Sequence, residues 1–348
     1  IYFQQPDSDP VPVTSDTGLR FADMIFDRRR HSLICVCEDH RNRKAEPLNQ
    51  LIRLNLMEKR DIGSHSLNVL AAGSDFYASP TLSPDGSQLA WISWDHPNMP
   101  WDGTELWVGR IGQDGALENV ERVSGGADES IFQPQWSPDG TLYFVSDRTG
   151  WWNIYRWENN RIEPLAAMEA EFGMPQWVFG MSTYAFESAQ RLICAFTRKG
   201  SWRLAEIDLA TDKIKIIETP YTDIAYLKAA AGQAVFAGGT ASEAASVVRL
   251  DLTTHEPEIL RRSSRVDIDG GFLSVPQPIE FPTAQGQTAH AFFYPPQNKD
   301  YRAPDAERAP LIVISHGGPT ASTTQTLNLA IQYWTSRGVA VLDVNYGG

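Results

Sequence analysis

The residues best suited to chemistry form the stretch His316-Gly317-Gly318-Pro319, which closely follows an apolar run at 311–314. Adjacent glycines allow backbone amides to approach a substrate closely and to point at negative charge that develops on a carbonyl oxygen. One such donor is typically worth roughly 3 to 4 kcal/mol of transition-state stabilisation. We therefore interpret His316, Gly317 and Gly318 as an oxyanion loop, with an ordinary tight turn as the alternative.

A second candidate site is the pair of carboxylates Glu169 and Glu171, which Ala170 separates. Side chains two residues apart point to the same side of an extended strand. The pair could then present negative charge to the ammonium group of a ligand. Ordinary solvated loop carboxylates are the alternative, and the residues alone leave both open.

The elements around the first site predict a βαβ unit. The apolar run at 311–314 is continuous, as expected of a parallel strand covered on both faces. Apolar residues recur at helical spacing from about 323 to 337, with threonines ahead of them as caps and Gly338 as a stop. A second apolar run follows at 339–344. His316 then lies beyond the carboxyl end of a strand, where open α/β sheets bind ligands.

A repeat organises the region before residue 268. The stretch Pro80-Thr81-Leu82-Ser83-Pro84-Asp85-Gly86 recurs as Pro134-Gln135-Trp136-Ser137-Pro138-Asp139-Gly140, and Pro175-Gln176-Trp177 begins a degenerate third copy. Pro-Asp-Gly favours a tight turn between two strands. Units of roughly 50 residues with about four short strands each are typical of propeller blades. We expect five blades from about residue 20 to 262 and part of another at 1–13.

Composition excludes several classes of protein. The 348 residues are 42% hydrophobic and 21% charged, which is typical of a soluble globular chain. A net charge of −13 opposes binding to nucleic acid, and no apolar run approaches the length of a membrane span. The three cysteines, Cys35, Cys37 and Cys194, lie in apolar runs and are expected to be buried hydrophobic residues. The loop at 94–102 offers one His and two Asp, a poor ligand set, so we expect no metal and no cofactor.

The tandem Ser-Pro-Asp-Gly units, followed by residues 310–319 and 334–346, resemble the acylaminoacyl-peptidase and dipeptidyl-aminopeptidase branch of the prolyl oligopeptidase family. The resemblance spans nearly the whole chain. It implies a mostly β fold, with a β-propeller at 1–268 and the first strands and helix of an α/β-hydrolase domain at 269–348. It also implies that Gly318 supplies a backbone oxyanion donor, framed by His316 and Gly317.

The resemblance further implies a serine peptidase that cleaves short peptides near the amino end through an acyl-enzyme, of aminopeptidase, dipeptidyl or acylaminoacyl type. The Glu169 and Glu171 pair is similar to the glutamate pair that anchors the free amino end in dipeptidyl peptidases, where the two residues are adjacent. Two alternatives remain: a non-catalytic propeller that binds a protein, and an esterase or amidase for small substrates.

No Gly-x-Ser-x-Gly occurs in the chain. We therefore expect the nucleophilic Ser and its Asp and His beyond residue 348, and we regard the chain as a fragment that lacks the nucleophile region. The expected partners are a short peptide substrate and the remainder of the hydrolase domain, with neither nucleic acid nor membrane. A homo-oligomer is left open, and the expected location is the cytoplasm.

Overall fold

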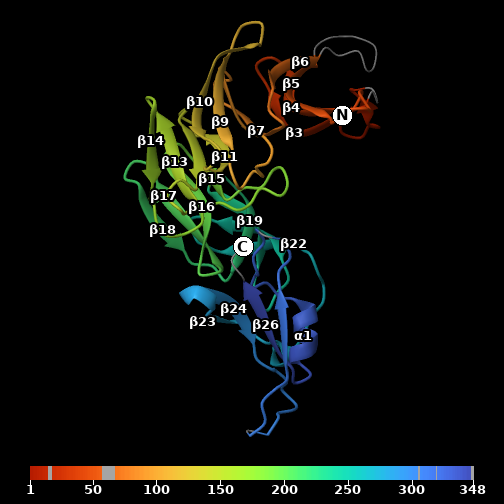
Figure 1. Ribbon diagram of the computed structural model, residues 1–348, viewed down its shortest axis with the longest axis vertical. Helices are drawn as coiled ribbons and strands as arrows, with labels where there is room; N and C mark the ends of the chain where they lie inside the picture. Colours follow the sequence, from red (N-terminus) through yellow and green to blue (C-terminus); the bar gives the residue numbers. More distant parts are fainter. Residues whose placement is uncertain (15–17, 57–66, 305, 319, 346–348) are drawn as a thin grey trace. The chain divides into compact units, whose positions relative to one another are not determined.

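The computed structural model describes residues 1–348 except 15–17, 57–66, 305, 319 and 346–348. Two compact units divide the chain. The first contains Ile1–Glu169 and Gln176–Met181, and the second contains Ala170–Pro175 and Ser182–Gly348. Strands dominate both units (Figure 1). The predicted domain limit at 268 and 269 stays a prediction.

The first unit contains, within its described residues, three four-stranded antiparallel sheets in which the strands follow chain order. A short two-stranded ladder precedes them. The strands are β1 (Tyr2–Phe3) and β2 (Val11–Pro12) in the ladder; β3 (Leu19–Asp27), β4 (Ser32–Asp39), β5 (Leu48–Asn55) and β6 (Leu67–Ala72); β7 (Phe76–Leu82), β8 (Gln88–Trp94), β9 (Glu105–Ile111) and β10 (Leu117–Gly125); and β11 (Ile131–Trp136), β12 (Leu142–Ser146), β13 (Asn153–Glu158) and β14 (Arg161–Leu165).

Neighbouring sheets of this unit pack face to face. Ile34 and Leu51 of the β3–β6 sheet share one buried cluster with Leu89 of the β7–β10 sheet. Ile92 of the β7–β10 sheet shares a second cluster with Phe144 of the β11–β14 sheet. All five side chains are buried because each sheet covers the apolar face of the next, which is how propeller blades are stabilised.

The two complete Ser-Pro-Asp-Gly copies form the same turn. The hydroxyl of Ser83 accepts a hydrogen bond from the amide of Gln88 at 2.9 Å, and that of Ser137 accepts from the amide of Thr141 at 3.0 Å. Each hydroxyl also donates to the Asp two residues later, Asp85 or Asp139. The serine therefore closes the turn that connects the first two strands of its sheet.

The second unit contains two more antiparallel sheets of this kind and one mixed sheet within the part of the chain that the structure describes. Ile193 and Leu204 of the first antiparallel sheet share a buried cluster with Phe236 and Val248 of the second. The strands of these two sheets are β15 (Tyr184–Phe186), β16 (Arg191–Arg198), β17 (Ser201–Asp208) and β18 (Lys213–Ile217); and β19 (Asp223–Ala230), β20 (Gln233–Gly239), β21 (Ser246–Asp251) and β22 (Pro257–Arg262).

The first strands of four sheets carry a bulge that the sequence did not reveal. The pairing register shifts within β3, β7, β11 and β19. At each shift one residue other than glycine adopts a left-handed backbone, with a φ of +49° to +57°. These residues are Asp23, Ser79, Gln133 and Tyr226. A bulge of this kind bends the strand and increases its twist.

The mixed sheet has the order β23 (Gln277–Pro282), β24 (Thr288–Tyr294), β26 (Ala340–Asn345) and β25 (Leu311–Ser315). β25 and β26 are parallel, and α1 (Leu329–Thr335) lies between them in the chain. Ile331 of α1 packs on Phe292 and Val341 of the sheet. Short 3₁₀ turns at Gly270–Phe272 and Ala284–Gly286 precede β23 and β24. The predicted fold class, propeller blades followed by the first strands and helix of an α/β-hydrolase domain, is confirmed.

Two local predictions were wrong. The helix begins at Leu329, later than the predicted start near Thr323, because the side chain of Asn328 accepts from the amide of Ala330 and caps the helix there. The degenerate copy at Pro175 does not open a strand, since β15 begins at Tyr184. The prediction for the cysteines is confirmed: all three are buried, and burial raises the pKa of the Cys35 thiol to about 12. No helix in the described ranges is long and apolar enough to cross a membrane.

Candidate active site

The Gly317-Gly318 turn lies at the carboxyl end of β25. Ser315, the last residue of β25, pairs with Val344 near the end of β26, so the turn follows the edge where two parallel strands end. Gly318 has a φ of +70°, a conformation that glycine adopts without a steric penalty. A Cβ added at Gly317 would meet open space, and both glycines are exposed. The backbone of the turn is thus accessible to a substrate, while Pro319 lies outside the described residues.

Asp343 introduces a carboxylate beside this turn. Its partner across the β25–β26 ladder is Ile314, and Ile314 lies two residues before His316 in the chain. Burial raises the pKa of Asp343, and the neighbouring charge of His316 opposes that shift. We did not single out Asp343 from the sequence, although a carboxylate inside the apolar run 339–344 is a signal that could have identified it.

Two buried hydroxyl groups lie in the segment that follows the turn, and a third lies in the mixed sheet, where Tyr294 pairs with Val341. The hydroxyls of Tyr294, Thr320 and Thr323 have no hydrogen-bond partner among the described residues. Burial, together with the charge of Asp343, raises the pKa of Tyr294 to about 12. The segment that follows the exposed turn thus contains two buried polar groups, the hydroxyls of Thr320 and Thr323.

Backbone and side-chain contacts hold the segment that leads from the turn to α1. The amide of Thr323 donates to Oδ1 of Asn345 at 3.3 Å. The hydroxyl of Thr326 donates to Oδ2 of Asp223 at 2.9 Å. These threonines were predicted to cap the helix. They instead connect the segment to the end of β26 and to the start of β19.

Glu169 and Glu171 lie in the irregular connection between β14 and β15. The side chain of Glu169 is exposed, that of Glu171 is half-buried, and Ala170 between them is fully buried. The backbone of Glu171 pairs with Thr197 of β16. Their role as an anchor for an amino group stays a prediction.

Arg148 and Glu129 form an ion pair beside the turn at 147–150. Nη2 of Arg148 lies 2.7 Å from Oε1 of Glu129, and its guanidinium lies 4.8 Å from the centre of the Tyr155 ring. Burial opposes ionisation of Glu129, but hydrogen bonds from Ser146 and Arg148 outweigh it and hold the pKa of Glu129 below its usual value. Arg148, which belongs to the polar turn at 147–150, therefore has its charged partner within the same unit.

The loop at 94–102 packs against an exposed aromatic segment at 176–181. Trp101 packs on Trp177 with ring centres 4.5 Å apart, and Trp177 and Phe179 are exposed. Nδ1 of His96 lies 2.9 Å from Oδ2 of Asp75. In the described part of the chain no group of three or more His, Cys, Asp or Glu residues could hold a metal ion.

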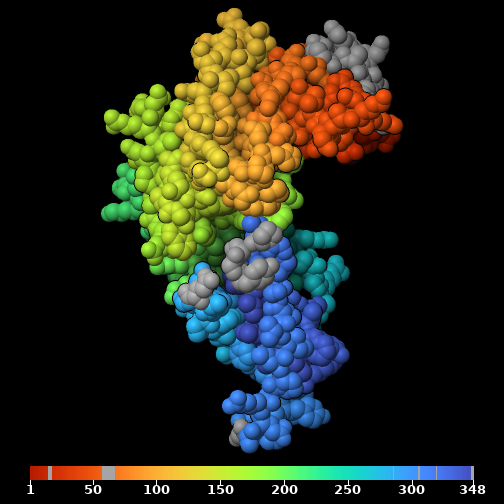
Figure 2. All heavy atoms as spheres, in the orientation of Figure 1, coloured from red at the N-terminus to blue at the C-terminus, as the bar shows by residue number. Residues whose placement is uncertain are grey.

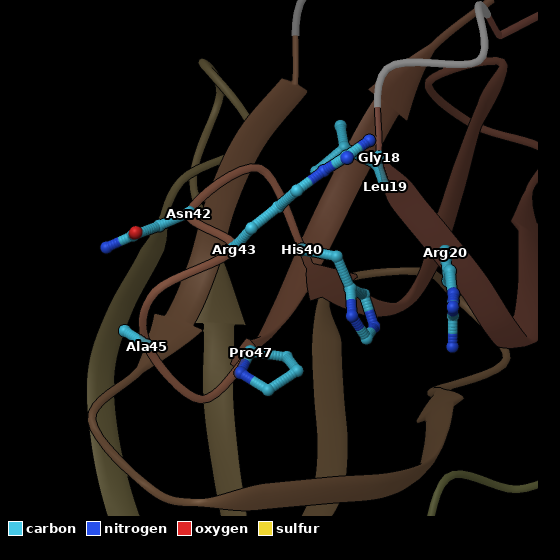
Figure 3. A pocket seen from close by; sticks show the side chains of 8 residues that line it. All are labelled: Gly18, Leu19, Arg20, His40, Asn42, Arg43, Ala45 and Pro47. Atoms are coloured by element: carbon cyan, nitrogen blue, oxygen red, sulfur yellow. The ribbon is translucent and has the colours of Figure 1, made fainter.

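Two hollows are lined by none of the candidate residues. One, of about 490 Å³, is lined by Arg20, His40 and Arg43 on the β3–β6 sheet (Figure 3). The other, of about 850 Å³, lies between the 296–309 connection, which projects from the mixed sheet (Figures 1 and 2), and residues 335–338. These segments precede β25 and β26, so this hollow is at the amino ends of the parallel strands. Ligands of open α/β sheets bind at the opposite edge.

No protein-family model and no curated protein matches the sequence. Solved structures do match it. A puromycin-hydrolysing peptidase of Mycobacterium tuberculosis is 36% identical, with a TM-score of 0.90 over 98% of this chain and 53% of its own. A serine-to-alanine variant of puromycin hydrolase complexed with PGG is 33% identical, with a TM-score of 0.87 over 97% of this chain and 52% of its own.

A more distant match shows the fold alone. Prolyl oligopeptidase B from Galerina marginata is 12% identical, with a TM-score of 0.70 over 94% of this chain and 46% of its own. This chain therefore spans about half the length of the solved structures that it matches.

Proposed function

Because the chain belongs to the prolyl oligopeptidase family of peptidases, we propose that it supplies the propeller and the oxyanion loop of a serine peptidase. The enzyme cleaves short peptides at or near the amino end. The reaction proceeds through an acyl-enzyme, in which a serine hydroxyl attacks the peptide carbonyl and the amine departs. Aminopeptidase, dipeptidyl and acylaminoacyl specificities all fit this scheme.

The observation that carries the proposal is the exposed Gly317-Gly318 turn at the carboxyl end of β25. As the serine attacks, negative charge develops on the carbonyl oxygen. The amide of Gly318 donates a hydrogen bond to that oxygen, and His316 and Gly317 frame the donor. Removal of one such donor typically lowers kcat by roughly 10²- to 10³-fold.

In the aminopeptidase and dipeptidyl schemes, in which the substrate has a free amino end, the carboxylates of Glu169 and Glu171 bind that ammonium group. Support comes from the exposure of Glu169, from the half-buried position of Glu171, and from the burial of Ala170 between them. A carboxylate that bonds an ammonium group makes a charge-assisted hydrogen bond, about twice as strong as a neutral one. The pair thereby sets how far from the amino end the peptide is cut.

Puromycin belongs among the substrates to be tested, because two matching solved proteins are named for its hydrolysis. Two other functions remain as alternatives. A propeller that only binds a protein partner would carry no reactive serine. An esterase or amidase for small substrates would hydrolyse short esters and leave peptide amides intact.

Labelling of the full-length protein with a fluorophosphonate tests the proposal, together with assays on aminoacyl amides, puromycin and short esters. We expect one labelled serine and turnover of the amides. A folded protein that resists labelling would favour the binding propeller. Labelling with turnover of esters alone would favour the esterase.

A further inference from the structure

The segment at 320–328, which connects the Gly317-Gly318 turn to α1, is fastened to the β19–β22 sheet. The hydroxyl of Thr326 donates to Oδ2 of Asp223 at 2.9 Å, across 103 positions of the chain. The amide of Leu327 donates to the carbonyl of Thr240 at 2.8 Å. Asp223 begins β19 and pairs with Gly239 at the end of β20, so both contacts fall at one end of this sheet.

Gly239 makes this contact sterically possible. A Cβ added there would lie 2.4 Å from the hydroxyl oxygen of Thr326 and 2.7 Å from its methyl carbon. Real Cβ contacts are longer, so any side chain at position 239 would displace the segment. Gly239 is buried and has no positive φ. Close approach of Thr326, rather than backbone conformation, therefore requires glycine at this position.

The same segment also contacts the mixed sheet, at a residue closer to the Gly317-Gly318 turn. The amide of Thr323 donates to Oδ1 of Asn345, the last residue of β26, at 3.3 Å. Residues 320–328 contain neither helix nor strand. Without a regular ladder of its own, the segment depends on these contacts for its position.

Helix capping does not account for Thr326. The side chain that caps α1 belongs to Asn328, which accepts from the amide of Ala330 at 3.0 Å. The hydroxyl of Thr326 is directed instead to Asp223. Its placement thus serves the contact between the segment and the β19–β22 sheet.

We propose that Asp223, Gly239 and Thr326 are positioning residues for the oxyanion loop, because they hold the segment that follows Gly318 against the β19–β22 sheet. This inference rests on the proposed peptidase function. The three residues do not touch the substrate and act through the backbone of Gly317 and Gly318. A misplacement of about 1 Å at such a site can cost roughly 100-fold in rate.

The test compares variants of the full-length protein in hydrolysis of an aminoacyl coumarin amide. Thr326→Val removes the hydroxyl and keeps the shape of the side chain. Gly239→Ala displaces the segment. Thr326→Ser keeps the hydroxyl donor. Thr211→Val is a matched control, because Thr211 donates to Oδ1 of Asp208 at the same 2.9 Å in the turn after β17. Gly270→Ala is the second control, since a Cβ there meets open space.

We expect Thr326→Val and Gly239→Ala to lower kcat about tenfold or more. The KM should stay within about twofold, because ground-state binding is not altered. Thr326→Ser and both controls should retain the wild-type kcat. Unchanged kcat in Thr326→Val and Gly239→Ala would overturn the proposal. An equal loss in the controls would also overturn it, because the effect would then be one of general stability.

Hydrogen exchange separates this proposal from the peptidase function itself. Amides of residues 316–318 and 320–328 should exchange faster in Thr326→Val than in wild type or in Thr211→Val. If the exchange rates of these amides are the same in Thr326→Val as in wild type, the proposed anchoring is wrong, whatever the activity of the variant. If the wild-type protein neither reacts with a fluorophosphonate nor hydrolyses amides, the proposed function fails, and faster exchange alone would still support the anchoring.

Discussion

Glu171 and Thr197 form an antiparallel backbone bridge. The amide of Glu171 donates to the carbonyl of Thr197 at 3.0 Å, and the amide of Thr197 donates back at 2.9 Å. The flanking side chains of Ala170 and Phe172 are fully buried, whereas that of Glu171 is only half-buried. The bridge therefore fixes the backbone that carries this carboxylate beside β16.

Glu171→Gln should raise the KM for peptides with a free amino end and spare an N-acylated ester. The substitution keeps the shape of the side chain and removes its charge. Loss of one partner of a charge pair that is buried and hydrogen-bonded in the complex costs roughly 2 to 5 kcal/mol in binding. Steady-state kinetics on both substrates measure the difference.

The control for Glu171→Gln is Glu218→Gln, which removes the same charge from an exposed position after β18. It should change neither KM. Equal effects of Glu171→Gln on the two substrates, or no effect on either, would return Glu169 and Glu171 to ordinary solvated carboxylates.

Asp343→Asn should stabilise the protein at neutral pH. Burial raises the pKa of Asp343 in the folded state. The folded protein then holds this proton more tightly than the unfolded chain, in which the pKa of an aspartate is about 3.9. The contribution of Asp343 to stability is full below that pH and is lost as the pH rises through the folded pKa. Urea denaturation at pH 4 and pH 7 should show that the variant gains free energy of unfolding over the wild type only at pH 7.

Asp251→Asn provides the opposite case. Amides of Thr254 and Thr253 donate to Asp251 at 2.9 and 2.8 Å and hold its pKa below the usual value. Its contribution is present above the unfolded pKa and is lost as the pH falls through the folded pKa. The variant should therefore lose stability at pH 7 and little in acid. The same pH trend in both variants would contradict this assignment.

Ser137→Ala should destabilise the first unit. The hydroxyl of Ser137 is buried and accepts from the amide of Thr141 at 3.0 Å, and removal leaves that donor without this acceptor. Loss of one partner of a buried hydrogen bond costs about 1 to 3 kcal/mol. Thermal unfolding measures the change, with Ser242→Ala as a control because Ser242 is exposed. A Tm equal to that of the control would show that the turn does not need the hydroxyl.

Local chemistry made much of the fold predictable. The Ser-Pro-Asp-Gly turns depend on contacts such as Ser83 with Gln88, only five positions apart. Residues that are so near one another in the sequence meet in any arrangement of the sheets. Their types alone therefore indicate the turn. The apolar runs that became β25 and β26, and the burial of Cys35 and Cys37, were likewise predictable from period and composition.

The sequence by itself therefore determined the blade strands, the turns and the Gly317-Gly318 site at a strand end, because each follows from residues next to one another. Only the tertiary structure decided the bulges, since the left-handed backbone of Asp23 and Ser79 follows from strand pairing and not from residue type. It also decided the start of α1 and the role of Thr326, whose partner Asp223 lies 103 positions away. Such a contact exists only once the chain has folded, and no local pattern records it.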